Sequence, residues 1–139
     1  MTRDQVVAAA GEDAHPEAVG GPDPASCDEF RPMNAPDGLL VMIRSGRLTR
    51  ISITGHPPIV TDAGLAVGDS VSAVHQAYGA AALPSPHAFH AAPAHYLTVW
   101  DVAPPSPSAH GIVYEIAATG RVLRILAGDA SIQYPEGCV

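Results

Sequence analysis

The chain carries one sequence pattern twice, and this internal repeat limits the folds open to it more than any other feature. Residues 2–11 run from a hydroxyl residue through a short amphipathic segment to a glycine, and residues 70–79 repeat that order. Self-similarity at a roughly constant spacing, here about 70 residues, indicates repeated supersecondary units. A chain of 139 residues is long enough for one domain with its own core. The sequence therefore predicts a single domain over residues 1–139, built of two repeats at about 1–60 and 61–139.

Each copy of the helical pattern is followed by two apolar stretches joined by a short turn. Residues 38–43 and 47–53 form the first pair, and residues 111–116 and 121–126 form the second. Branched apolar residues on both sides of a glycine-containing turn are typical of a β-hairpin. We therefore expect an α+β fold, in which two tandem helix–hairpin repeats form one curved antiparallel sheet with two short helices on one face.

Local signals define the helix starts and the remaining elements. Thr2 and Gln5 have the spacing of a capping box, in which each side chain bonds to the backbone of the other residue. Ser70 takes the cap position before an apolar stripe in the second copy. The other expected elements are a strand at 96–102, a brief edge strand at 59–61, a last strand at 131–134, and loops at 12–26 and 84–93.

The charge and hydropathy of the chain exclude two classes of partner. The formal net charge is −7, and all seven cationic side chains are arginine. Nucleic-acid binding requires clustered cations that displace counterions from phosphates, so we expect no nucleic-acid partner. No apolar run approaches the roughly 18 residues of a membrane-spanning helix, so we expect a chain that does not span a membrane.

The only two cysteines, Cys27 and Cys138, bracket most of the chain. Their spacing is unlike that of a metal-binding motif. A disulfide between them would close a loop of about 110 residues, which the chain-entropy model values at roughly 4–5 kcal/mol. The alternative is a pair of unrelated buried thiols in a cytosolic protein. We favour the disulfide, and with it a periplasmic or secreted protein whose signal segment is absent from this chain.

A short motif before the second helical pattern resembles the helix start of a known superfamily. Residues 64–70 read Gly-Leu-Ala-Val-Gly-Asp-Ser, and Val74 and a closing Gly79 follow. This pattern is similar to that of the β-lactamase inhibitory protein fold, which the small lipoprotein of the outer-membrane barrel-assembly machinery shares. The resemblance implies tandem helix-plus-hairpin units whose strands form one curved sheet, but the loops differ, so it implies no particular target. Residues 134–138, together with Cys27, resemble the ending of uncharacterised exported proteins of Gram-negative bacteria.

Three histidines are the candidates for a metal site. His87, His90 and His95 could present imidazoles to zinc or copper, although their loose spacing across a proline-containing loop fits ordinary loop histidines better. The chain has no nucleophile elbow, zincin helix or phosphate loop. Glu115 is the one acid inside a predicted strand, and it fits a solvated sheet face better than acid–base work. We therefore expect no catalytic residues, no enzyme activity and no cofactor.

Two arginines occupy the same position in the two hairpins. Strand alternation places Arg50 with Leu48, and Arg124 with Val122, on the face opposite the core. Arginine among apolar and aromatic residues is typical of a recognition surface, although arginine stems that shield leucine on a solvated face explain the same pattern. We expect both guanidinium groups to lie within reach of one partner. The full predicted partner-binding set is Arg50, Arg124, Leu48, Val122, Glu115 and Trp100.

Together these features predict a monomeric, non-catalytic, exported binding module that recognises a protein partner through its concave sheet face and loops. The alternative is a small metal- or ligand-binding periplasmic protein that uses the loop with His87, His90 and His95.

Overall fold

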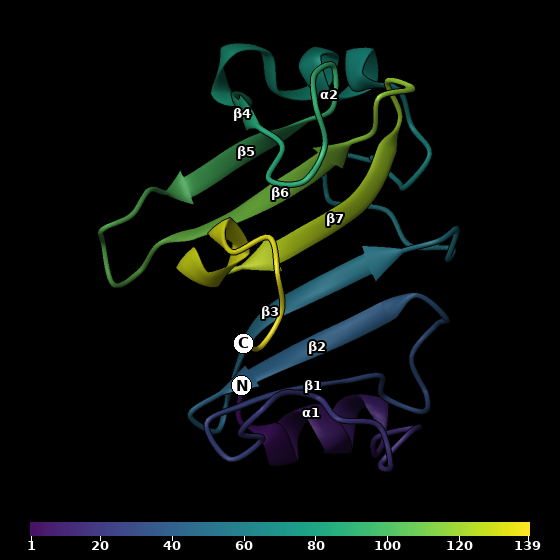
Figure 1. Ribbon diagram of the computed structural model, residues 1–139, viewed down its shortest axis with the longest axis vertical. Helices are drawn as coiled ribbons and strands as arrows, with labels where there is room; N and C mark the ends of the chain where they lie inside the picture. The colour runs from purple at the N-terminus through teal and green to yellow at the C-terminus, as the bar shows by residue number, and fades with distance from the viewer.

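The computed structural model describes residues 1–139 and shows an α+β fold, with one open antiparallel sheet and two short helices (Figure 1). The helices are α1 (Arg3–Ala10) and α2 (Val71–Tyr78), with short 3-10 helices η1 (Gly79–Ala81) and η2 (Ala130–Gln133). The strands are β1 (Cys27–Phe30), β2 (Leu39–Arg44), β3 (Arg47–Thr54), β4 (Leu83–Pro86), β5 (His95–Val102), β6 (His110–Ile116) and β7 (Val122–Gly128). They lie in the order β1-β2-β3-β7-β6-β5-β4. None of the helices is long and apolar enough to cross a membrane.

Both α-helices begin where a hydroxyl side chain caps them. The Thr2 hydroxyl accepts a hydrogen bond from the Gln5 amide, and the Gln5 side chain accepts one from the Thr2 amide, which confirms the predicted capping box. The Ser70 hydroxyl accepts from the Ala73 amide in α2. Helices of this length are marginal in isolation, so both depend on packing against the sheet.

Each helix start is hydrogen-bonded to the hairpin of its own half of the chain. The Arg3 amide donates to the Gly46 carbonyl at 3.1 Å, and the Val71 amide donates to the Gly120 carbonyl at 2.9 Å. These bonds join α1 to the turn between β2 and β3, and α2 to the turn between β6 and β7. β3 and β7 then pair with each other at the centre of the sheet.

A one-residue bulge interrupts each hairpin at a matching place. The pairing of β2 with β3 shifts beside Ile43 and skips Thr49. The pairing of β6 with β7 shifts beside Ile116 and skips Leu123. Because side chains alternate along a strand, one extra residue reverses the face of every side chain on one side of it.

Both helices pack on the same face of the sheet. Val6 of α1 belongs to a buried cluster with Val41, against which Ile51 packs. Val74 of α2 is fully buried in a larger cluster, against which Ile53 packs. Ile51 and Ile53 are two positions apart on β3 and therefore point to the same side.

The opposite face of the sheet, which we call the helix-free face, is partly covered by the end of the chain. η2 folds back over the middle of the sheet, and residues 134–139 follow it there (Figure 1). We call residues 134–139 the C-terminal strap. Ile132 of η2 is buried against Val113 and Leu126. Ser131 is also buried, and its hydroxyl donates to a carbonyl of β3. η2 is therefore anchored by both apolar and polar contacts.

Both edges of the sheet are protected from pairing with another chain. β4 carries Pro84 and Pro86, which have no backbone N–H to donate. On the outer side of β1, the Glu29 amide donates to the carbonyl of Gly20 in the preceding loop at 3.1 Å. Prolines on an edge strand and a covering loop both block edge-to-edge association.

Three expectations about local structure are wrong. Residues 59–61 form no strand, and residues 131–134 lie in and after η2 instead of forming a last strand. The Asp129 carboxylate accepts from the Ser131 amide, and this cap starts a 3-10 turn there. Part of the expected loop at 84–93 is strand β4, where pairing with β5 outweighs the low strand propensity of proline.

Candidate functional site

One row of cross-strand neighbours runs across the helix-free face from β1 to β5. The row consists of Glu29, Met42, Arg50, Gly128, Gly111 and Trp100. Gly111 makes room for η2, because a Cβ at this position would lie 3.2 Å from Cδ1 of Ile132 and 2.7 Å from the Trp100 ring. η2 therefore docks in the middle of the row and separates Arg50 from Trp100.

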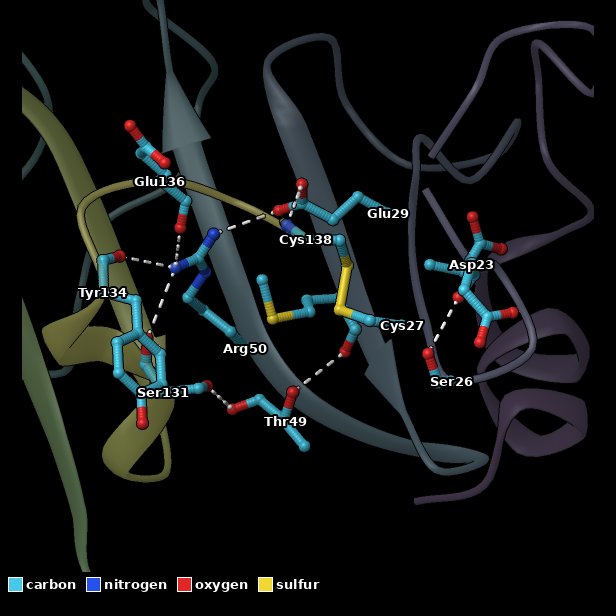
Figure 2. The surroundings of a disulfide bond; sticks show 12 residues. Asp23, Ser26, Cys27, Glu29, Thr49, Arg50, Ser131, Tyr134, Glu136 and Cys138 are labelled. Carbon is cyan, nitrogen blue, oxygen red and sulfur yellow. Dashed lines mark hydrogen bonds and ion pairs between the residues drawn. A yellow bond between two sulfur atoms is a disulfide. The ribbon is translucent and has the colours of Figure 1, made fainter. Parts of the chain in front are cut away.

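Arg50 is buried beneath the end of its own chain (Figure 2). Its side chain is 2% exposed, and its Nη2 donates to the Glu29 carboxylate at 3.0 Å. Nη1 donates to the carbonyl oxygen of Tyr134 at 2.9 Å and to those of Ser131 and Glu136 at 3.3 Å each. The buried Nε has no hydrogen-bond partner. The guanidinium group is thus almost fully engaged inside the protein.

Burial lowers the pKa of the Arg50 guanidinium, because a cation is less well solvated inside the protein. The Glu29 carboxylate opposes this shift through its charge and its hydrogen bond, while Arg124 and Arg44 add to it. Removing one partner of a buried ion pair leaves an uncompensated charge and costs about 3–5 kcal/mol. Arg50 and Glu29 therefore depend on each other for their burial.

The disulfide between Cys27 and Cys138 is present, as predicted, and joins the C-terminal strap to β1. The Cα atoms of the two cysteines are 5.6 Å apart, and no cysteine is free. The Cys138 amide also donates to the second oxygen of Glu29 at 3.2 Å. Gly137 lies so close to the Glu29 carboxylate that any Cβ would overlap it. Glu29 thus contacts both Arg50 and the strap.

A second buried network joins Arg124, Glu115 and His87. Nε of Arg124 donates to one oxygen of Glu115 at 2.7 Å, and Nη2 donates to the carbonyl of Pro135 in the strap at 3.1 Å. Nε2 of His87 lies 2.8 Å from the other oxygen of Glu115. The side chains of His87 and Glu115 are 2% and 10% exposed. Both carboxylate oxygens of Glu115 are therefore engaged.

These contacts correct the predicted roles of three residues. Arg50 and Arg124 do lie on the helix-free face, but both guanidinium groups are paired with carboxylates inside the protein instead of being presented to a partner. Both arginines donate hydrogen bonds to backbone carbonyls of the C-terminal strap, which is part of the same chain. Glu115 is a buried ion-pair partner and not a residue of a solvated face. The physical reason is that each cation finds carboxylate and carbonyl acceptors within the fold.

The predicted positions of Leu48 and Val122 are also wrong, and the two bulges explain both errors. Leu48 packs with the α1 cluster, and Val122 is buried in the α2 cluster. The unpaired residues Thr49 and Leu123 separate them from the arginines on the same strands. Simple alternation therefore assigns each to the helix-free face when it lies on the helix-covered one.

The three candidate metal ligands do not form a site. Nδ1 of His87 accepts from the amides of Phe89 and His90, each at 3.1 Å, so Nε2 carries the proton that Glu115 accepts. The His87 ring also stacks on Tyr96, with ring centroids 4.7 Å apart. His95 bonds through Nδ1 to a carbonyl of its own loop at 2.8 Å. No group of three metal-ligating side chains is present in the protein.

A groove of about 310 Å³ lies on the helix-free face between β4 and η2. We call it the neutral groove, and it is lined by Leu83, Pro84, Ser85, Tyr96, Thr98, Trp100, Val113, Leu126, Ile132, Gln133 and Pro135. Of these, only Trp100 belongs to the predicted partner-binding set. Tyr96 and Thr98 are alternate residues on β5 and therefore lie on the same face of the sheet as Trp100. This alternation is the sequence signal that could have identified them. Ser85 lies between Pro84 and Pro86, which from sequence alone predict a loop there instead of a strand.

The lining of the neutral groove combines apolar walls with available polar groups. None of its residues is charged. Tyr96 and Gln133 form hydrogen bonds within the protein, whereas the side chains of Ser85, Thr98 and Trp100 form none. Sites of this kind bury apolar parts of a ligand and orient it through a few polar contacts.

No protein-family model, curated protein or solved structure matches this chain.

Proposed function

We propose that the protein is an exported, non-catalytic binding module that receives a protein partner in the neutral groove. The observation that carries this proposal is the lining of the groove, in which Tyr96 and Trp100 lie beside polar side chains with no internal partner. Tryptophan and tyrosine are enriched among the residues that supply most of the binding energy at protein interfaces.

Exposed apolar side chains around the groove support a protein partner over a small molecule. Leu83 in the groove wall is 53% exposed. Tyr134, which precedes the groove residue Pro135 in the sequence, is 55% exposed. Val102, at the end of β5, is 40% exposed. A recognition surface that extends beyond a pocket in this way fits a partner that covers both the pocket and its rim.

A binding role without catalysis is supported by the state of the titratable groups on this face. Glu115 and Glu29 accept hydrogen bonds on both carboxylate oxygens, and both ring nitrogens of His87 are engaged. A general base must lie within hydrogen-bond reach of the proton that it abstracts from a bound substrate. None of these groups lines the neutral groove.

An oxidising compartment is supported by the disulfide, which joins the only two cysteines. Disulfides persist in the periplasm and outside the cell and are rare in the reducing cytosol. A monomeric state is supported by the two protected sheet edges, because neither presents an unpaired strand to a second copy.

We further propose that the two halves of the chain are duplicates of one helix–hairpin unit. Matching hydrogen bonds tie each helix start to its hairpin turn, and a bulge interrupts each hairpin at the corresponding residue, Thr49 or Leu123. These correspondences support the resemblance to the β-lactamase inhibitory protein fold, which stays a proposal.

The proposed function can be tested with one blocking variant and one matched control. Ser85→Arg adds a long cation at an exposed position in the neutral groove, whereas Ser72→Arg makes the same change at an exposed position on α2. A partner captured from periplasmic extract by the wild-type protein would be titrated against all three proteins. We expect Ser85→Arg to weaken binding at least tenfold, equal to about 1.4 kcal/mol, and Ser72→Arg to leave it unchanged.

Two results would contradict the proposal. In one, Ser72→Arg weakens binding as much as Ser85→Arg does, which would place the interface on the helix-covered face. In the other, Ser85→Arg binds like the wild type while both variants keep the wild-type circular dichroism spectrum.

A further inference from the structure

The C-terminal strap is held on the sheet without any buried apolar side chain. Tyr134 is 55% exposed and Val139 is 90% exposed. Arg50 and Arg124 donate hydrogen bonds to carbonyls of the strap, and Glu29 accepts one from the Cys138 amide. Arg44 also lies over the Tyr134 ring, 5.8 Å from its centroid. Pro135 is only half-buried, so these polar contacts must offset most of the conformational entropy lost by the six ordered residues.

A pocket that is open to solvent lies along the strap. It has a volume of about 300 Å³ and is lined by Cys27, Met42, Arg44 and residues 134–139. Fewer protein atoms contact the strap on this side, so it gains less dispersion energy than a fully packed segment would.

The preceding residues differ sharply from the strap. Ile132 is 2% exposed in an apolar cluster, and Ser131 is 3% exposed with bonds to β3 and to Asp129. η2 can therefore keep its place when the strap does not. The boundary between the two parts lies after Gln133, where η2 ends.

The closed strap also carries a cost at Arg50. The strap helps to exclude water from this guanidinium, and the Nε left without a partner would regain one in water. Opening the strap would rehydrate Arg50, so the closed and open states are closer in free energy than the number of hydrogen bonds suggests.

We propose that the Cys27–Cys138 disulfide is a redox-sensitive latch, whose reduction releases residues 134–139 from the helix-free face while the rest of the fold persists. Both cysteines are half-buried and therefore lie near the surface of the protein. A dithiol reductant attacks one sulfur as a thiolate and displaces the other cysteine, forming a mixed disulfide. Its second thiol then releases the protein, so that two electrons and two protons pass to the cysteines and the reductant becomes a disulfide.

Release would change the surface that the protein presents. Pro135 would leave the wall of the neutral groove, and Arg50 and Arg124 would lose the strap carbonyls that they bind. The inference concerns the strap alone and does not depend on whether the groove binds a partner.

Nuclear magnetic resonance of the full, isotope-labelled chain tests the latch. Backbone order parameters of residues 136–138 would be measured in the oxidised protein and after addition of excess dithiothreitol. We expect values of about 0.85 when oxidised and below about 0.6 when reduced, with residues 130–133 and the strands unchanged. The matched control is Cys27→Ser/Cys138→Ser, which should give the reduced pattern and not respond to dithiothreitol.

Either of two results would overturn the proposal. If residues 136–138 stay rigid after reduction, polar contacts suffice to hold the strap and the disulfide is not a latch. If the dispersed spectrum collapses throughout the chain on reduction, the disulfide holds the whole fold together.

Discussion

Nη1 of Arg50 lies 2.9 Å from the carbonyl oxygen of Tyr134, so a central strand holds the end of the chain through a buried cation. The same guanidinium group pairs with Glu29 on β1. Arg50→Ala would leave the Glu29 carboxylate without its counter-ion, and we expect it to lower the free energy of unfolding by about 3–5 kcal/mol. Urea unfolding followed by circular dichroism measures this change.

The matched control for Arg50→Ala is Arg47→Ala, which removes an exposed arginine from the same strand. A surface change of this kind is expected to stay within about 0.5 kcal/mol of the wild type. Equal effects of the two substitutions would show that the pair with Glu29 contributes nothing specific to stability.

His87 is expected to be structural, although it lies in a loop. His87→Ala leaves one oxygen of the buried Glu115 carboxylate without its partner and removes the ring that stacks on Tyr96. We expect a loss of about 1–3 kcal/mol of unfolding free energy, the cost of an unsatisfied buried acceptor. His15→Ala serves as the control because the His15 side chain is 64% exposed. A stability of His87→Ala equal to that of His15→Ala would contradict this role.

Tyr114 should make the fold less stable in alkali. Burial raises the pKa of its hydroxyl, which also bonds to Tyr78 and Thr61. Above the ordinary tyrosine pKa of about 10, the unfolded chain loses a proton that the folded protein retains. The free energy of unfolding therefore falls as the pH rises above about 10, while the contribution is fully present below it.

The measurement is urea unfolding of the wild type and of Tyr114→Phe at several pH values between about 8 and 11. We expect a smaller decrease with pH in Tyr114→Phe, because it has no hydroxyl to ionise at this site. Tyr134→Phe, at an exposed position, should behave like the wild type. An identical pH dependence in Tyr114→Phe and the wild type would contradict the assignment.

Periodicity predicts the hairpins and helices of this fold but not the faces of all their residues. Alternation is correct for Arg50 and Arg124, which follow the bulges on their strands. It fails for Leu48 and Val122, because a single unpaired residue reverses the count. The residues next to each bulge carry no sequence signal for it, because the shift in register depends on how the two strands pair.

The candidate site was harder to predict than the fold because its parts come from distant segments. Arg50 and Arg124 are recognisable as a matched pair, but their acceptors are backbone carbonyls of residues 131–136, which carry no sequence signal. Trp100 was identified, whereas its neighbours across the groove come from a proline-containing strand and from η2. Residue types alone do not show which segments the tertiary structure brings together.

Chemical-shift mapping of the bound complex tests the neutral groove as the binding site most directly. The isotope-labelled protein would be titrated with the captured partner, and amide shifts would be followed along the whole chain. Binding through the groove predicts the largest shifts in β4, β5 and residues 130–134, with the exposed side of α1 and α2 unchanged. Shifts confined to α1, α2 and their loops, with β4 and β5 unaffected, would contradict it.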